Sequence, residues 1–149
     1  MSKLIADELV NSIQIQPRDV EGSLRLLDIK GSEEVLVITS TLGFFSLSEM
    51  LYVASGVHDR EGIGIDNTGF RYPTDELDPG QEPLEGVEIY NPLGEVQVPI
   101  LAFEHLMARY LRALITEAKK RNDSVIQQSW WCEFVMTTQQ IEERLRQGE

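Results

Sequence analysis

The 149-residue chain carries 25 Asp and Glu against 13 Lys and Arg, a net charge of −12, and 42% of its residues are hydrophobic. This charge argues against a nucleic-acid backbone or an anionic membrane surface as the main partner, and no uncharged run approaches the roughly 20 residues of a membrane span. The N-terminus lacks the apolar core of a signal peptide, and Cys132 is the only cysteine. We therefore expect one cytoplasmic domain over 1–149 without an intrachain disulfide.

The first half of the chain is expected to mix helices and strands. Val35–Ile38 is a β-branched run without alternation, which is typical of a central strand covered on both faces. Leu51–Val53 suits either a helix or a strand. The predicted elements of this half are, in order, a helix from Lys3 to about Ile13, strands at 13–16, 23–30 and 35–38, and a short helix over 46–56 that ends at Gly56.

Two β-hairpins are predicted in the middle of the chain. Asp66–Gly69 and Asn91–Gly94 contain the Asp, Asn and Gly residues that tolerate the positive φ values of tight turns. The strands of these hairpins are expected at 62–65 with 70–72, and at 87–90 with 95–98.

The longest predicted element is a helix over about 99–121. Pro99 suits its first turn, where a missing N–H costs nothing. The apolar residues recur at three- and four-residue steps, which places on one face Ile100, Phe103, Met107, Tyr110, Leu111, Leu114 and Ala118. This helix is expected to be the core element of the fold.

The C-terminal region is predicted as a strand followed by a short helix. Alternation over Trp130–Met136 favours the strand, with a helix from Ser124 as the alternative. Because neighbouring side chains of a strand point to opposite faces, one of Trp130 and Trp131 would need cover from a helix, a partner or a second copy. Ile141 and Leu145 make a narrow apolar stripe, so the last helix is expected to be short and mostly solvated.

These elements predict an α+β fold. We expect an antiparallel or mixed sheet of about five to six strands, with the long helix packed on one face and short helices at the termini. The order of the strands does not follow from the sequence.

No catalytic or cofactor motif is recognisable. His58-Asp59 has the letters of a metal dyad but lacks further ligands at helical spacing, so neither a metal nor another cofactor is expected. Gly64–Gly69 has the glycine spacing of a phosphate loop, but Phe70-Arg71 follows where Lys-Ser/Thr would be needed. An enzyme with an unrecognised site would have to use His105, Glu104 and His58, and we expect Glu104 and His105 on the polar side of the long helix.

Acidic residues are concentrated in one quarter of the sequence. Residues 61–99 contain nine Asp and Glu against Arg71 alone, a net charge of −8. Most of these acids lie in or near the Pro- and Gly-rich stretch 73–85, which is predicted to be an exposed loop. A solvated loop would explain them, but interleaved tyrosines favour a surface that attracts a basic partner. The candidate partner-binding residues are Asp66, Tyr72, Asp75, Glu76, Asp78, Glu82, Glu85, Glu88 and Tyr90.

A small acidic chain with an acidic segment from Glu61 to Glu95 resembles the bacterial immunity proteins of polymorphic-toxin and contact-dependent growth inhibition systems. The resemblance rests on size, charge and that segment, and it carries no residue-by-residue correspondence. It implies a cytoplasmic inhibitor that binds a basic toxin domain, for example a nuclease domain, at its active site or at an exosite.

The leading hypothesis is therefore a non-enzymatic acidic protein that binds a basic protein partner. Alternatives are the enzyme already described, a secretion-type chaperone or phage-encoded adaptor that would be an obligate dimer, and a structural assembly subunit. The assembly hypothesis depends on an outward tryptophan and predicts a concentration-dependent oligomer, with a homodimer as its simplest form.

Overall fold

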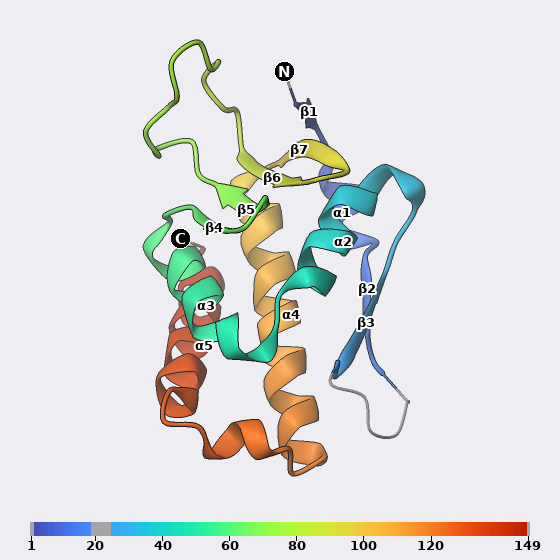
Figure 1. Cartoon of the computed structure of the whole chain (residues 1–149), viewed down its shortest axis with the longest axis vertical. Helices are drawn as coiled ribbons and strands as arrows, with labels where there is room; N and C mark the ends of the chain where they lie inside the picture. Colours follow the sequence, from blue (N-terminus) through green and yellow to red (C-terminus); the bar gives the residue numbers. More distant parts are fainter. Residues whose placement is uncertain (1, 19–24, 149) are drawn as a thin grey trace.

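The structure is a computed structural model that describes residues 2–18 and 25–148. Within these residues the chain forms a five-stranded sheet, a two-stranded sheet and helices that pack beneath and beside both (Figure 1). The order of the large sheet is β1-β7-β6-β5-β4. β1 pairs with β7 in parallel, and the other neighbours are antiparallel, so the sheet is mixed. The strands are β1 (Lys3–Leu4), β2 (Gln14–Pro17), β3 (Leu27–Lys30), β4 (Ile63–Ile65), β5 (Thr68–Arg71), β6 (Val87–Asn91) and β7 (Gly94–Val98).

Both predicted hairpins are present in the large sheet. Asp66, in the turn between β4 and β5, has a φ of 56°, as its predicted turn requires. Gly94 opens β7 with a φ of 142° opposite Asn91. Alternation then sends Val87 and Ile89 into the core, while Glu88 and Tyr90 point to the other face, here called the outer face.

The helical elements differ most from prediction near the N-terminus. The predicted helix from Lys3 to Ile13 is instead the short strand β1 followed by α1, because the amide of Ile5 bonds to the carbonyl of Gln97 on β7. The helices are α1 (Asp7–Asn11), α2 (Leu36–Phe44), α3 (Met50–Asp59), α4 (Ile100–Lys120) and α5 (Trp131–Arg146), with 3₁₀ turns η1 (Glu33–Val35), η2 (Leu47–Glu49) and η3 (Ser124–Gln127).

The predicted central strand Val35–Ile38 is wrong, because this segment enters helix α2. Val35 and Ile38 are completely buried in the core, whereas Leu36 is 48% exposed, so only part of this apolar run faces the core. The helix packs against β6. The side-chain amide of Asn91 fixes this contact by donating to the carbonyl of Val37 at 3.0 Å and to Ser40 Oγ at 2.8 Å.

The two-stranded sheet follows the predicted strands in part. β2 pairs antiparallel with β3, with Ile15 opposite Ile29. Of the predicted strand 23–30, only Leu27–Lys30 is extended, and residues 23–24 lie outside the described residues. The short helix over 46–56 is present as η2 and α3, but it ends at Asp59 rather than at Gly56, because Arg60 adopts the left-handed conformation.

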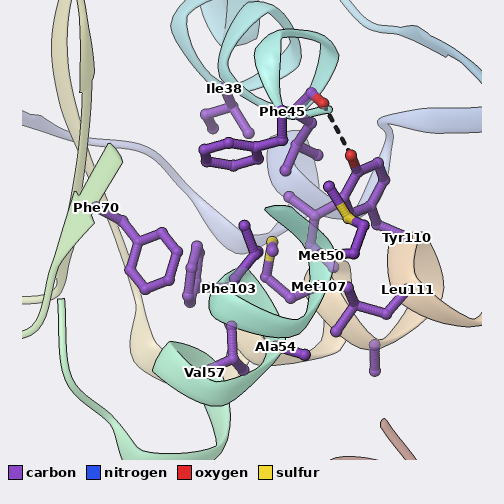
Figure 2. Packing of buried hydrophobic residues seen from close by; sticks show 14 of the residues in the cluster. Ile38, Phe45, Met50, Ala54, Val57, Phe70, Phe103, Met107, Tyr110 and Leu111 are labelled. Atoms are coloured by element: carbon purple, nitrogen blue, oxygen red, sulfur yellow. Dashed lines mark hydrogen bonds between the residues drawn. The ribbon is translucent and has the colours of Figure 1, made fainter. Parts of the chain in front are cut away.

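Helix α4 is the predicted long helix, and its apolar face is the spine of the core. Its first turns pack against the large sheet, where Phe103 lies 5.0 Å from the ring centre of Phe70. Its later turns contact α1, α3, α5 and the two-stranded sheet (Figure 1). Figure 2 shows Met107, Tyr110 and Leu111 continuing this packing, and the Tyr110 hydroxyl donates to the carbonyl of Leu42 at 3.0 Å.

The predicted strand Trp130–Met136 is also wrong and the helical alternative is correct in part, since residues 131–136 belong to helix α5 and Trp130 is its N-cap. Trp131, Phe134 and Ile141 face the core at helical spacing, and Trp131 is only 7% exposed. Trp130 is half-buried, with its ring centre 6.0 Å from that of Phe134. The last helix is therefore long and packed against α3 and α4, and both tryptophans are covered within the chain.

The predicted α+β class is confirmed, with the long helix packed against a mixed sheet. Within the described ranges, no single helix is both long and apolar enough to cross a membrane. Glu33–Phe44 and Leu47–Asp59 meet the length and composition criteria only as a pair, and the pair is bent by 89°.

Candidate functional site

The outer face of the large sheet carries a row of polar side chains. Cross-strand register places Arg71 of β5 opposite Glu88 of β6, and Glu88 opposite Gln97 of β7. Ser2 approaches from the start of β1 and donates from Oγ to Glu88 Oε2 at 2.9 Å. Gln97 Nε2 donates to Ser2 Oγ at 3.0 Å, so the row is bonded from strand to strand.

The acidic loop between β5 and β6, residues 72–86, folds over this row. Arg71 holds it there by donating from Nη1 to Gln81 Oε1 at 3.0 Å and by an ion pair with Asp78 at 3.4 Å. At the other end of the loop, the backbone amides of Glu85 and Gly86 donate to Gln97 Oε1 at 2.7 and 3.2 Å. Side chains of the sheet thus anchor the middle and the C-terminal end of the acidic loop.

Between the acidic loop and the sheet lies a cleft of about 450 Å³, here called the acidic cleft. Four carboxylates and a single guanidinium are among its lining side chains. Its residues are Ser2, Arg71, Asp78, Pro79, Gly80, Gln81, Glu82, Pro83, Leu84, Glu88, Glu95 and Gln97. The acidity that the sequence concentrates in one segment therefore lines a concave site.

Glu88 is the most buried carboxylate of the acidic cleft, with 4% of the residue exposed. Its Oε2 accepts the hydrogen bond from Ser2, but no hydrogen bond from the described residues reaches its Oε1. Arg71 Nε lies 3.6 Å from Oε1, an ion pair without a hydrogen bond. A carboxylate buried this deeply is ordinarily hydrogen-bonded on both oxygens, whereas Oε1 is itself buried and is compensated by the charge of Arg71.

Tyr90 lies across the outer face beside the acidic cleft. Its hydroxyl is 2.8 Å from where a β-carbon on Gly64 would lie and 2.9 Å from the same point on Gly69, so these glycines make room for it. The Arg71 guanidinium lies 5.4 Å from the centre of the Tyr90 ring, within cation–π range. Burial raises the pKa of the Tyr90 hydroxyl, which stays protonated at neutral pH.

The predicted partner-binding residues differ in their exposure to solvent. Five of them are exposed: Asp66, Glu76, Asp78, Glu82 and Glu85. Tyr90 is half-buried on the outer face, and Glu88 is buried within the acidic cleft. Tyr72 does not fit the predicted role, because it is 1% exposed and its ring packs edge-on against Phe103 at 5.9 Å. Asp75 is half-buried, and its Oδ2 accepts from the backbone amides of Tyr72 at 2.6 Å and Gly62 at 3.0 Å. Asp75 therefore shapes the start of the acidic loop.

Glu104 lies at the centre of a second polar cluster, here called the Glu104 cluster and made of Glu104, Arg60, Arg144 and Tyr72. Glu104 is completely buried, contrary to its predicted place on the polar side of the long helix. Arg60 donates to both of its oxygens at 2.9 and 3.0 Å, Arg144 donates to Oε2 at 3.2 Å, and the Tyr72 hydroxyl donates to Oε2 at 2.8 Å. Burial and the adjacent Glu104 carboxylate raise the pKa of Tyr72.

The Glu104 cluster joins three helices to the end of β5. Arg144 of α5 also donates to the carbonyls of His58 at 2.7 Å and Val57 at 3.2 Å, at the C-terminal end of α3. Both Glu104 oxygens accept hydrogen bonds within the protein and the residue is completely buried, so this carboxylate offers no accessible position to a substrate. The cluster is a structural junction.

The three residues of the enzyme alternative do not converge. The ring of His58 pairs with its neighbour Asp59 at 2.8 Å, and only its backbone carbonyl takes part in the Glu104 cluster. His105 is exposed in a groove between α4 and α5, which also contains the ion pair of Arg112 with Glu142 at 2.5 Å. Glu104 points into the core instead of toward His105.

A further cavity of about 360 Å³ lies between β3, α2 and the middle of α4. Its walls include the core residues Leu26, Leu42, Met50 and Leu114.

Among residues 2–18 and 25–148, no three His, Cys, Asp or Glu side chains are grouped so that they could hold a metal ion.

Comparisons of the chain with protein-family models, with curated proteins and with solved structures found no match.

Proposed function

We propose that the chain is a non-enzymatic binding protein that receives a basic protein partner on its acidic loop and outer face. The observation that carries this proposal is the acidic cleft, which is lined by four carboxylates and by the single guanidinium of Arg71. A concave surface of one charge sign raises the local concentration of oppositely charged partners and accelerates their association.

The most concrete form of this function is that of an immunity protein, which binds and neutralises a basic toxin domain such as a nuclease. Size, net charge and the acidic segment support this role. An acidic loop that is anchored at its middle and at its C-terminal end also supports it, because a preordered surface loses less conformational entropy when it binds. The assembly-subunit hypothesis loses its motivating feature, since Trp131 is buried and Trp130 is packed against Phe134.

The test of partner binding asks whether the gene beside this one encodes a basic protein, and follows the association of that protein with this chain by stopped flow. Changing the exposed residues Glu76, Glu82 and Glu85 together to Lys should slow association by at least about tenfold at low salt, and should weaken its dependence on ionic strength. Asp75 is left intact because it supports the backbone of the acidic loop.

The matched control changes the exposed residues Glu33, Glu34 and Glu133 to Lys, which alters the net charge equally but away from the acidic segment. Its association rate should stay within about threefold of the unmodified protein. Equal slowing in both variants would show that total charge is sufficient and would contradict a specific acidic surface.

The immunity role itself is tested by growth: cells that express the neighbouring gene should be rescued by this chain and not by the loop variant.

A further inference from the structure

We infer that the groove between α4 and α5, here called the basic groove, is a docking site for an acidic amphipathic helix of a partner protein. Its volume is about 560 Å³. Among the described residues, the basic groove and the acidic cleft have no lining residue in common, so this inference is independent of the proposed function. Residues that line the groove include Arg109, Arg112 and Ala113 of α4 and Glu142, Leu145 and Arg146 of α5.

The solvent face of α4 carries cations and no exposed acid. The two acidic residues of this helix, Glu104 and Glu117, are only 0% and 5% exposed. A chain with a net charge of −12 therefore presents one helix whose charged surface is positive. The cations of this surface are Arg109, Arg112, Lys119 and Lys120.

Arg109 is the cation of the basic groove without an opposing charge. Its Nη1 donates to the carbonyl of Ile13 at 3.0 Å, and none of the carboxylates in residues 2–18 and 25–148 pairs with it. Desolvation lowers the pKa of Arg109, and no described carboxylate counteracts this effect. A guanidinium held in a groove with its charge uncompensated is suited to pair with a carboxylate supplied by another molecule.

The other guanidiniums of the basic groove are already paired. Arg112 pairs with Glu142 at 2.5 Å and so joins α4 to α5, and Arg146 pairs with Glu143 on its own helix. When both of these carboxylates are counted, the charge of Arg109 remains. The groove is therefore positive, and an acidic partner complements it.

The floor of the basic groove is apolar. Ala108 is 9% exposed, and Ala113 and Leu145 are half-buried. The small alanine side chains allow another element to approach α4 closely, and its apolar side chains would be buried between the two helices. A nucleic-acid backbone would leave this floor unused. The complementary partner consequently carries carboxylates together with apolar side chains.

The walls of the basic groove favour a helix as the incoming element. The backbone amides and carbonyls of both walls are bonded within α4 and α5, so an extended strand has no edge with which to pair. Along α4, the lining from His105 to Ala113 rises by about 12 Å, the length of roughly two helical turns. A helix with one apolar face and acids beside it would meet the floor and Arg109 together.

The test titrates the purified chain with three synthetic peptides of about 14 residues, each long enough to span the groove as a helix. The first has Leu at helical spacing on one face and Glu elsewhere, the second has Lys in place of Glu, and the third has Ser in place of Leu. Backbone ¹H–¹⁵N shifts of Ala108, Ala113 and Leu145 report binding in the groove. The first peptide should bind at least about tenfold more tightly than either of the others, and more weakly as salt is added.

The decisive variant combines Arg109→Gln with Arg146→Gln. It removes two positive charges, while a glutamine at position 109 keeps an N–H donor for the carbonyl of Ile13. Loss of hydrogen bonds to charged groups should weaken binding of the first peptide by about tenfold or more. The matched control combines Lys3→Gln with Lys30→Gln, two exposed lysines on β1 and β3 outside the groove, and should change binding by less than about twofold.

A second variant, Ala113→Gln, tests the floor without changing the charge. Its longer side chain would fill the space that the apolar face of the peptide needs, so binding should also weaken by about tenfold. If the double variant does not fold, Arg146→Gln alone replaces it, because this side chain is 70% exposed, and the direction of its effect is the same.

Unchanged binding in the groove variants, equal weakening in the lysine control, or a basic peptide that binds as tightly as the acidic one would each overturn the inference. Two other occupants of the groove would overturn it as well. Tighter binding of a single-stranded oligonucleotide of similar charge would assign the groove to nucleic acid. A dimer in light scattering that Arg109→Gln dissociates would assign it to a second copy of this chain.

Discussion

The Glu104 cluster and the acidic cleft both contain a carboxylate with almost no exposure to solvent. Glu104 accepts from two arginines and a tyrosine, so all of its charge is compensated inside the protein. Glu88 accepts one hydrogen bond from Ser2, and its remaining oxygen is buried beside Arg71 in an ion pair at 3.6 Å. Burial of a charge therefore does not identify a functional site by itself. The number of hydrogen bonds that each carboxylate accepts distinguishes Glu104 from Glu88.

The largest expected effect is on the Glu104 cluster. Glu104→Gln leaves the guanidiniums of Arg60 and Arg144 without their counter-charge and should lower the free energy of unfolding by about 3 kcal/mol, near the lower end of the usual range because Arg60 is partly exposed and can be rehydrated. Urea unfolding at neutral pH measures this loss. Glu117→Gln on the same helix is the control and should cost about 1 kcal/mol, since it breaks a single pair with a partly exposed Arg121.

The next effect concerns Tyr72, which donates to Glu104. Tyr72→Phe should cost about 1.5 kcal/mol, because it removes one hydrogen bond to a charged acceptor. Tyr52→Phe, at a tyrosine that is 50% exposed, is the control and should leave stability nearly unchanged. A loss as large as that of Glu104→Gln would mean that the hydroxyl, rather than the arginines, holds the cluster together.

Tyr72 also predicts a dependence of stability on alkaline pH. Burial and the charge of Glu104 raise its pKa in the folded state, so the folded protein keeps a proton that the unfolded chain releases near pH 10. The stabilisation is complete below about pH 10 and declines as the pH rises above it. The decline should be shallower in Tyr72→Phe, and urea unfolding at pH 8 and pH 11 would show the difference. A decline equal to that of the unmodified protein would assign the effect to Tyr90 and Tyr110, whose pKa values burial also raises.

The smallest effect on stability is expected at Glu88. Glu88→Gln removes a buried charge that is only partly compensated, so the free energy of unfolding should change by less than about 1 kcal/mol, in either direction. A loss of stability comparable to that of Glu104→Gln would make Glu88 a second structural junction and would remove the contrast between the two sites.

The sequence predicted those elements whose signals are local. Helix α4 was predicted because a single apolar stripe runs through it, and the β4–β5 hairpin because Asp66 can adopt a positive φ. The first part of helix α5 was predicted as a strand, with a helix only as the alternative, because its stripe was divided at Thr137 between that strand and a short helix. Trp131, Phe134, Thr138 and Ile141 have helical spacing throughout, and Thr138 is buried because its hydroxyl bonds to the carbonyl of Phe134. A polar residue in the middle of the stripe concealed its length.

The candidate site was predictable in composition but not in arrangement. The excess of acids in residues 61–99 follows from the sequence, whereas the burial of Glu88 requires knowledge that β1, β6 and β7 bring Ser2 and Gln97 beside it. Glu104 was placed on the polar side of α4 because it is charged. Its partners Arg60, Tyr72 and Arg144 are 44, 32 and 40 residues away, so no local pattern reveals them.

The aromatic packing at the start of α5 has a practical consequence for measuring these effects. The chain has two tryptophans, and both are packed with Phe134, at the end of α4 that is remote from the large sheet (Figure 1). Their fluorescence should change when α5 separates from the core and should remain nearly constant when a ligand binds at the acidic loop. The chain thus contains a fluorescent probe that reports unfolding and does not respond to ligand binding, so folding and binding can be measured on the same sample without a label.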